Sequence, residues 1–271
     1  METISRLKKV RRIAETVTRI SIARRAFLGF GYALSGNASP REVWLDQDGG
    51  WEDVAALAIL LRSPGVKVIG ISITPGIANA ATARTRITML LEDLRERDAK
   101  LSEDIPAGAD ILATGPLTRI AKLMGQSREP AALTWMGGAI HITGNAKGGA
   151  EWNAAADAAA LGIIMGSNIP LTLCPLDLTN RFPSRGSVLS LGGSRVAQEL
   201  RRAYGEKERY WWDELAAASI AAPGLFRREK RMLSAGRSGK LVLNPSGKLV
   251  EVLTACDASG FEALLQRSLR F

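Results

Sequence analysis

The sequence predicts a single α/β domain in which helices cover both faces of a mostly parallel sheet. From Val43 onward, short apolar runs alternate with helical patterns, as expected of strand–helix–strand units. Polar residues or glycines follow each apolar run, at the strand ends where a parallel sheet of this kind binds ligands. We assign residues 43–271 to this domain and residues 1–42 to a basic N-terminal extension.

Each element follows from its own pattern. Strands are predicted over the apolar runs 43–45, 66–73, 111–113, 133–136 and 171–174. Helices are predicted over 54–61, 80–97, 117–124 and 154–165. The first of these helices is apolar all round, as expected of a helix that covers a sheet, and the third is opened by Gly115-Pro116.

Polar residues just beyond the strands are the first candidates for a functional site. Ligands of such folds bind outside the carboxyl ends of the strands. The candidate residues are Asp46 and Asp48, Thr74 to Gly76, Thr114 and Gly115, Gly137 and Gly138, and Asp177.

An acidic loop is the most distinctive of these segments, because Asp46, Asp48, Glu52 and Asp53 place four carboxylates within eight residues. Like charges so close together repel and need a counter-ion or protonation. Capping of the following helix offsets part of the repulsion, and a divalent cation offsets it better. Carboxylate oxygens suit Ca²⁺ or Mg²⁺ rather than zinc. The loop therefore predicts a metal site, with a capped, solvated loop as the alternative.

The acidic loop and the helix after it, DQDGGWEDVAALAILL, resemble the signature of the nucleoside hydrolases, Asp-x-Asp-x-Gly-x-Asp-Asp followed by an apolar helix. Five further segments follow in that family's order: ISITPGIAN, ILATGPLTRIAKLM, WMGGAIHITGNAKGGAEWN, LCPLDLTNRF and YWWDELAAA. The resemblance covers most of residues 43–271. It implies a Rossmann-like nucleoside hydrolase fold and calcium-dependent hydrolysis of the N-glycosidic bond of a ribonucleoside, which releases base and ribose.

The resemblance also implies roles for single residues. Asp48 would bind the metal and deprotonate the attacking water. Asp53, the backbone carbonyl of Thr114 and Asp213 would complete the protein's share of the Ca²⁺ site. Glu52 stands where the family usually has an aspartate that binds a ribose hydroxyl. An oxocarbenium-like transition state needs this negative charge, a firm hold on the sugar and an activated water.

Further substrate-binding residues are implied at Asn79, Met136, Asn145, Glu151, Asn153 and Trp212. Trp212 takes the place of a histidine that often serves leaving-group protonation in this family. A tryptophan there suggests stacking on the base, with packing in the core or at the rim as the alternative. The only histidine, His141, is expected to be a solvated residue of the glycine-rich loop, with contact to the base as the alternative.

Other functions are open at this point. A relative that binds a nucleoside or ribose without turnover fits a chain shortened between Asn79 and Thr114 and between Asn180 and Asp213. The Asp46-x-Asp48-Gly segment also fits the nucleophile loop of haloacid-dehalogenase-like phosphatases. That interpretation lacks a later acidic pair for Mg²⁺ and leaves the segment from Gly137 to Asn153 without a purpose.

The net charge of +9 does not indicate a nucleic-acid partner, because residues 1–42 hold nine Lys/Arg against three acids. No apolar segment is long enough to span a membrane. We expect a small-molecule nucleoside partner, no nucleic acid and no membrane, and leave a homo-oligomer open. A cytoplasmic location is favoured, with organelle import or twin-arginine export from the basic tail as alternatives. The two cysteines are expected to be buried thiols.

Overall fold

A computed structural model describes residues 39–184, 192–205 and 209–270 of the chain. Its main sheet contains eight strands in the order β2-β1-β3-β4-β5-β10-β8-β9. These are β1 (Arg41–Gln47), β2 (Val66–Ile73), β3 (Asp110–Ala113), β4 (Ala132–Met136), β5 (Leu171–Cys174), β8 (Phe226–Ala235), β9 (Leu241–Leu243) and β10 (Lys248–Cys256). The first six strands in the spatial order are parallel, and β8 and β9 add antiparallel pairs at one side. The predicted mostly parallel α/β fold is confirmed.

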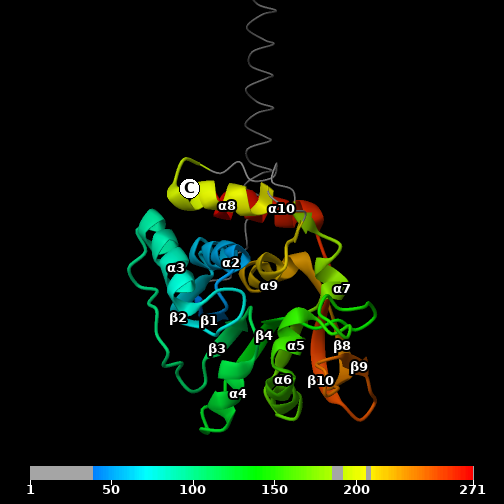
Figure 1. Ribbon diagram of the computed structural model, residues 1–271. Helices are drawn as coiled ribbons and strands as arrows, with labels where there is room; N and C mark the ends of the chain where they lie inside the picture. The colour runs from blue at the N-terminus through cyan, green and yellow to red at the C-terminus, as the bar shows by residue number, and fades with distance from the viewer. Residues whose placement is uncertain (1–38, 185–191, 206–208, 271) are drawn as a thin grey trace, which may run out of the picture. The chain divides into compact units, whose positions relative to one another are not determined.

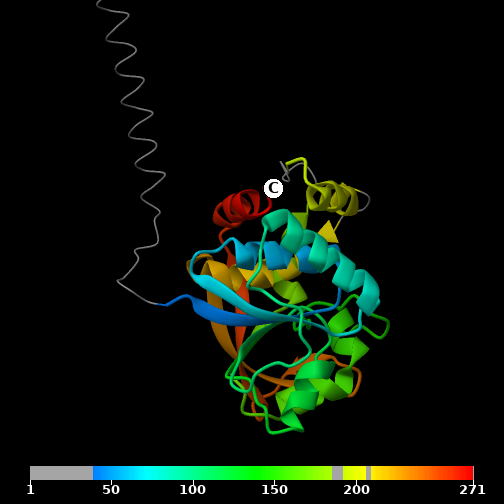
Figure 2. The same ribbon diagram turned by 90° about the vertical axis from the view of Figure 1, so that its left-hand side faces the viewer.

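Helices lie on both faces of this sheet (Figures 1 and 2). One face carries α2 (Trp51–Leu61), α3 (Ala80–Leu94), α8 (Arg195–Gly205), α9 (Asp213–Ala221) and α10 (Ala258–Ser268). The other carries α4 (Thr118–Met124), α5 (Trp152–Ala156) and α6 (Ala158–Met165). The short elements α7 (Leu176–Thr179), η2 (Pro223–Leu225) and the hairpin of β6 (Pro183–Ser184) with β7 (Arg209–Tyr210) connect them. Two separate apolar clusters fill the spaces on the two faces of the sheet.

Helix α2 is enclosed on all sides, which explains why its sequence is apolar all round. It packs against strand β2 and along α9, while α8 and α10 pack on it from outside the sheet. Every residue from Glu52 to Leu60 is buried as a result. The two acids at its first turn are therefore held on a rigid element, away from bulk water.

The carboxyl ends of the parallel strands are level with one another. Register pairs join Gln47 to Ile73, Asp46 to Ala113, and Ala113 to Trp135. The chain runs from β1 to β2 on one side and returns to β3 on the other, so the strand order reverses at β1. Such a reversal leaves a crevice beyond the strand ends, which is where α/β proteins bind ligands.

The structure differs from the predicted elements in several places. Strand β1 and helix α2 begin at Arg41 and Trp51, before the predicted residues 43 and 54. Helix α3 ends at Leu94 rather than residue 97, because Arg95 adopts a left-handed conformation. The helix predicted over 154–165 is two helices, since Asp157 leaves the helical conformation and its side chain caps α6. The strands β8, β9 and β10 and the helices α8, α9 and α10 are not predicted. Cys174 is buried as expected, but Cys256 at the end of β10 is only half-buried.

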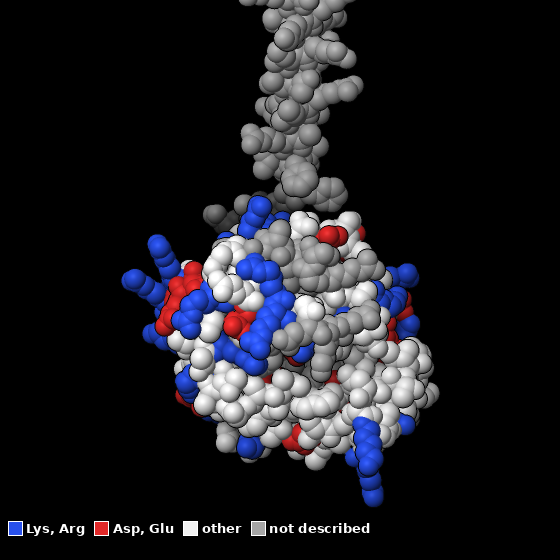
Figure 3. Space-filling model, turned by 45° about the horizontal axis from the view of Figure 1, so that its top comes forward, with Lys and Arg blue, Asp and Glu red and all other residues white. Residues whose placement is uncertain are grey.

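Charge on the described surface is mixed. Lys and Arg side chains lie beside Asp and Glu, and neither sign covers the whole face shown in Figure 3. None of the described helices is both long and apolar enough to cross a bilayer. Residues 1–38, which hold most of the predicted basic extension, lie outside the described residues, so its proposed targeting role stays a prediction.

Truncation tests the boundary of the domain. The contacts of the folded unit begin at Pro40, and β1 begins at Arg41, whose side chain pairs with Asp110. Removing residues 1–38 is expected to leave the melting temperature within a few degrees. Removing residues 1–42 should lower it further, because the start of β1 and this surface ion pair, worth about 0.2–1 kcal/mol, are lost. Thermal melts of the two truncated proteins measure the difference. If the protein that lacks only residues 1–38 fails to fold, the domain boundary near residue 40 is wrong.

Candidate active site

A cavity of about 190 Å³ lies beyond the carboxyl ends of β1, β3 and β4. Its walls combine carboxyl groups, amides and large apolar side chains from seven segments. The lining residues are Asp48, Glu52, Ile77, Thr114, Met136, Asn145, Glu151, Trp152, Asn153, Trp212 and Asp213. Nine of these eleven are residues that the sequence predicts for the site, and Ile77 and Trp152 are the two that it does not.

The cavity has a polar floor and an apolar mouth. Asp48, Glu151 and Asp213 are only 2–3% exposed, whereas Trp152 is 36% and Ile77 54% exposed. The carboxyl groups therefore lie at the inner end, and the large apolar side chains lie where the cavity meets solvent. A ligand with a polar hydroxylated part and a flat apolar part matches this division.

Asp48 is positioned by the turn that leaves β1. Gly49 has a φ of +90°, which favours glycine, and a Cβ on Gly49 would lie 2.6 Å from the Cβ of Ala83. Glycines also make room for the Asp48 side chain itself, since a Cβ on Gly76 would lie 2.2 Å from its Oδ2 atom. This Oδ2 is buried and has no hydrogen-bond partner among the described residues. Burial raises the pKa of Asp48 to about 6, and the neighbouring charge of Glu52 adds to the rise.

Asp53 is tied to two neighbours from the first turn of α2. Its Oδ1 accepts a hydrogen bond of 2.5 Å from the Thr114 hydroxyl, and its Oδ2 accepts one of 2.7 Å from the Gly50 N–H. Burial raises its pKa well above the usual range, and the charges of Asp48 and Glu52 add to the rise. The carboxyl groups of Asp48 and Asp53 lie close enough to share a hydrogen bond when one is protonated. Asp53 thus lies behind the cavity wall, next to Asp48.

Asp213 comes to the same place from the far end of the sequence. It is the first residue of α9, the helix that packs along α2. Burial raises its pKa well above the usual range, and the carboxyls of Asp53 and Glu52 add to the rise. Asp213 at the start of α9 therefore lies near Asp53 in α2 and near Asp48, which follows β1.

Glu52 has a partner that sequence reasoning does not find. Its Oε2 lies 3.3 Å from a terminal nitrogen of Arg209 in strand β7. The Nε of Arg209 is buried and without a partner among the described residues. The pair orients the Glu52 carboxylate at the cavity wall, and no local pattern joins two residues so far apart in sequence.

Glu151, Asn153 and Asn145 form the opposite polar wall. Glu151 caps α5, and its two carboxyl oxygens accept backbone N–H groups of Gly138, Asn153 and Ala154. The Asn153 amide donates to the carbonyls of Thr114 and Met136, both at 3.1 Å. Asn145 accepts the Trp152 N–H at 2.8 Å. These bonds fix the side chains before any ligand enters.

Some candidates lie elsewhere. Asn79 is exposed and caps α3, where its Oδ1 accepts the Thr82 N–H at 2.9 Å, so the structure does not bring it to the cavity. Asp46 points into the sheet, accepts the hydroxyls of Ser72 and Thr74, and lies 3.2 Å from Arg119. Its role is structural.

Two further candidates also lie outside the cavity. Asp177 accepts the backbone N–H groups of Ile140 and His141, so it holds the glycine-rich loop rather than a ligand. His141 is exposed, as expected of a solvated loop residue, and is not among the residues that line the cavity.

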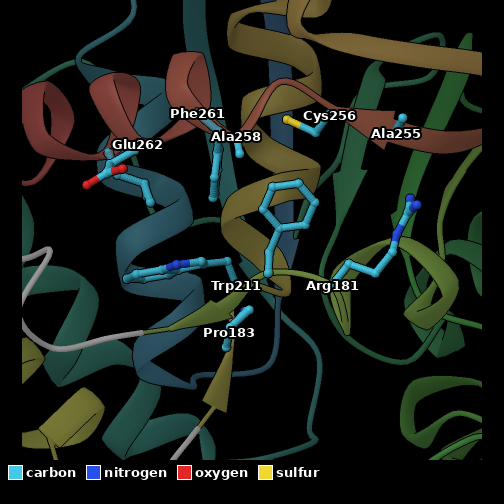
Figure 4. Close-up of a pocket in the computed structure, with 10 residues that line it drawn as sticks. Arg181, Pro183, Trp211, Ala255, Cys256, Ala258, Phe261 and Glu262 are labelled. Atoms are coloured by element: carbon cyan, nitrogen blue, oxygen red, sulfur yellow. The ribbon is translucent and has the colours of Figure 1, made fainter.

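A second, larger hollow of about 560 Å³ lies near α10 and is separate from this cavity (Figure 4). Phe182 and Trp211 both pack edge-on against Phe261, and all three side chains line the hollow. Cys256 borders it, and burial raises the pKa of that thiol to about 12, so it is not a reactive thiolate. The hollow contains none of the predicted site residues.

A family model described as "Inosine-uridine preferring nucleoside hydrolase" matches residues 97–263. This is more than half of the chain. The chain belongs to the inosine-uridine preferring nucleoside hydrolase family. The match begins after the acidic loop, so the likeness of that loop rests on its own residues.

Curated relatives of this nucleoside hydrolase family member carry a more specific name. The pyrimidine-specific ribonucleoside hydrolase RihA of Citrobacter koseri is 28% identical over 206 residues, which cover 64% of each chain. The protein of the same name from Photobacterium profundum is 37% identical over 87 residues, which cover 31% of this chain and 28% of that one. The chain spans less than two thirds of the length of these relatives.

Solved structures of nucleoside hydrolases share the fold. The inosine-uridine preferring enzyme from Bacillus anthracis superposes with a TM-score of 0.72 at 21% identity, over 85% of this chain and 99% of that one. A plant nucleoside hydrolase superposes with a TM-score of 0.73 at 19% identity, over the same shares. At these identities the likeness concerns the fold.

The acids of this nucleoside hydrolase family member fit a hard cation in their chemistry. Asp48 presents a buried oxygen without a partner, and Asp53 and Asp213 bring two more carboxyls beside it. Oxygen donors of this kind suit Ca²⁺. In the described part of the chain, no group of three His, Cys, Asp or Glu side chains already has the arrangement of a formed metal site. Binding would therefore require these side chains to rearrange.

Proposed function

We propose that this chain hydrolyses the N-glycosidic bond of a ribonucleoside, releasing base and ribose, with Ca²⁺ held by Asp48, Asp53, Asp213 and the carbonyl of Thr114. The observation that supports it is a single cavity whose inner end gathers buried carboxyl groups and amides and whose mouth is apolar. Cleavage of a glycosidic bond develops positive charge on the sugar. Fixed carboxylates in a water-poor pocket stabilise that charge.

The residues divide the work as follows. Asp48, whose carboxyl lies at the inner end of the cavity with one oxygen free of hydrogen bonds from the described residues, takes a proton from the attacking water. Glu52, held by Arg209, accepts a hydrogen bond from a ribose hydroxyl. Asn153 uses its N–H groups on two carbonyls, which leaves its oxygen for another hydroxyl. Bound Ca²⁺ would neutralise the gathered carboxylates and acidify the water.

Metal binding is tested by stability. Ca²⁺ is expected to raise the melting temperature, because it binds only the folded arrangement of acids. At a hundredfold excess over its Kd, the free energy of unfolding should rise by about 2.7 kcal/mol. Asp53→Asn should abolish the gain, although its remaining oxygen still accepts the Thr114 hydroxyl. Asp98→Asn, at an exposed acid away from the cavity, should keep it. Identical melts with Ca²⁺ and with EGTA would show that the metal assignment is wrong.

A nucleoside- or ribose-binding protein without turnover is the second candidate function. It is favoured by Asp53, because both carboxyl oxygens of this residue already accept hydrogen bonds within the protein. Titration calorimetry with ribose, together with chromatography of a ribonucleoside panel in excess Ca²⁺, separates the two. Release of free base supports the hydrolase, whereas ribose binding with no base released supports the second candidate.

A further inference from the structure

We propose that the substrates best suited to this cavity are N-ribosides whose heterocycle carries a positive charge, such as pyridinium ribosides or N7-alkylated purine ribosides. The inference rests on the proposed hydrolytic function and adds the class of leaving group. It starts from the chemistry of the bond. When C1′–N breaks, its electron pair stays on nitrogen, water supplies the new C1′–O bond, and Asp48 takes the water's proton.

The fate of that electron pair decides which bases can leave. A neutral base departs as an anion unless a protein acid protonates it, and such an acid typically contributes about 10²–10⁴-fold to the rate. A cationic heterocycle departs as a neutral molecule and needs no proton. A cavity without a proton donor at its mouth therefore favours cationic substrates.

The titratable residues among those found to line the cavity are all carboxyls, and the two glutamates have other partners. Glu151 accepts three backbone N–H groups, and Glu52 pairs with Arg209. Asp48 and Asp213 lie at the floor, where the sugar and the metal are proposed to bind. No imidazole, ammonium or phenol is found among the described lining residues, and the position next to Asp213 is Trp212.

The mouth itself suits a flat cation. Trp152 and Trp212 both line the cavity, and Trp152 is 36% exposed beside its opening. The face of an indole ring attracts a cation within about 6 Å of the ring centroid. Two indole rings that line one cavity form a site for a positively charged, flat ring.

Guanosine and 7-methylguanosine are a matched pair of substrates, compared at a pH at which the methylated base keeps its N1 proton. With Ca²⁺ present and after correction for uncatalysed loss of base, kcat/KM is expected to be about 10²–10⁴-fold higher for 7-methylguanosine than for guanosine. This factor is the rate contribution that a general acid would otherwise make to the departure of the neutral base. p-Nitrophenyl riboside, whose phenolate leaves without a proton, reports hydrolysis of the ribosyl bond itself.

The outcomes separate the two proposals. If p-nitrophenyl riboside and both nucleosides are inert, the proposed function is wrong and this inference falls with it. If p-nitrophenyl riboside is hydrolysed but 7-methylguanosine has no advantage over guanosine, the inference alone is overturned.

Substitution of Trp152 tests the aromatic mouth. Trp152→Leu is expected to raise KM for 7-methylguanosine about two- to fivefold, the range of an exposed cation–π contact. It should change the Ki of guanosine, used as a competitive inhibitor, by less. Trp152→Phe keeps an aromatic face and should restore most of the loss. Equal losses for the charged and neutral nucleosides in the leucine variant would contradict a cation-binding mouth.

Discussion

Asp48→Asn is expected to lower kcat by about 10²–10⁴-fold, the usual loss when a general base is removed. The variant keeps one oxygen at the cavity floor but cannot take a proton from water. KM should change less, because the groups proposed to bind the sugar, at Glu52, Asn145 and Asn153, are untouched. Steady-state kinetics on a ribonucleoside, with Ca²⁺ in excess, measures the split between kcat and KM.

The matched control for this experiment lies two residues earlier in the chain. Asp46 has the same side chain but accepts hydrogen bonds from Ser72 and Thr74 within the sheet. Asp46→Asn is expected to lower the free energy of unfolding by about 1–3 kcal/mol, because an amide nitrogen cannot accept one of those hydrogen bonds. Near-wild-type turnover in the Asp48 variant would rule out its proposed role as the base.

Gly76→Ala is expected to lower kcat by about 10²-fold with a smaller effect on the melting temperature. A Cβ at this position would lie 2.2 Å from Asp48 Oδ2 and 2.5 Å from Asp48 Cβ, so the carboxyl must move. Displacing a catalytic group by about 1 Å costs a factor of this size. The fold should survive, because Gly76 lies in an exposed loop outside the apolar core.

Gly65→Ala is the control for this substitution. A Cβ there meets nothing within 4 Å, and its φ lies outside the left-handed region. Kinetics and thermal melts of both variants should show a loss of turnover only at residue 76. If Gly76→Ala turns over as fast as the unmodified protein, then the position of Asp48 is not set by this close contact.

The parallel half of the fold was predictable because its strands are continuous apolar runs. β2 coincides with the predicted strand over 66–73. The antiparallel addition was not predictable in the same way. β8 reads FRREKRMLSA, with only Leu233 fully buried, so its charged residues hide the strand pattern. The break at Asp157 was missed because a single polar residue interrupts an otherwise continuous helical pattern.

The site was predictable to the extent that strand ends converge. Asp48, Thr114 and Met136 line one cavity because β1, β3 and β4 end at the same edge. The other six predicted residues that line it follow from the family resemblance. Asn79 was misleading, since an asparagine beside a strand end is also a common helix cap. The partner of Glu52 at Arg209, and the tryptophan at the cavity mouth, depend on how distant segments pack, and no local pattern records that.

The enclosure of α2 has a consequence for how the protein opens. Glu52 and Asp53 sit on a helix that is buried between the sheet and the outer helices α8 and α10. Amide protons of a helix in this position reach solvent only when the surrounding layers separate, so they should be among the slowest to exchange with deuterium. The cavity mouth is made by exposed side chains such as Trp152 and Ile77, which can rearrange without such an opening. Ligands can therefore come and go on a timescale far shorter than the one on which the acidic floor is exposed.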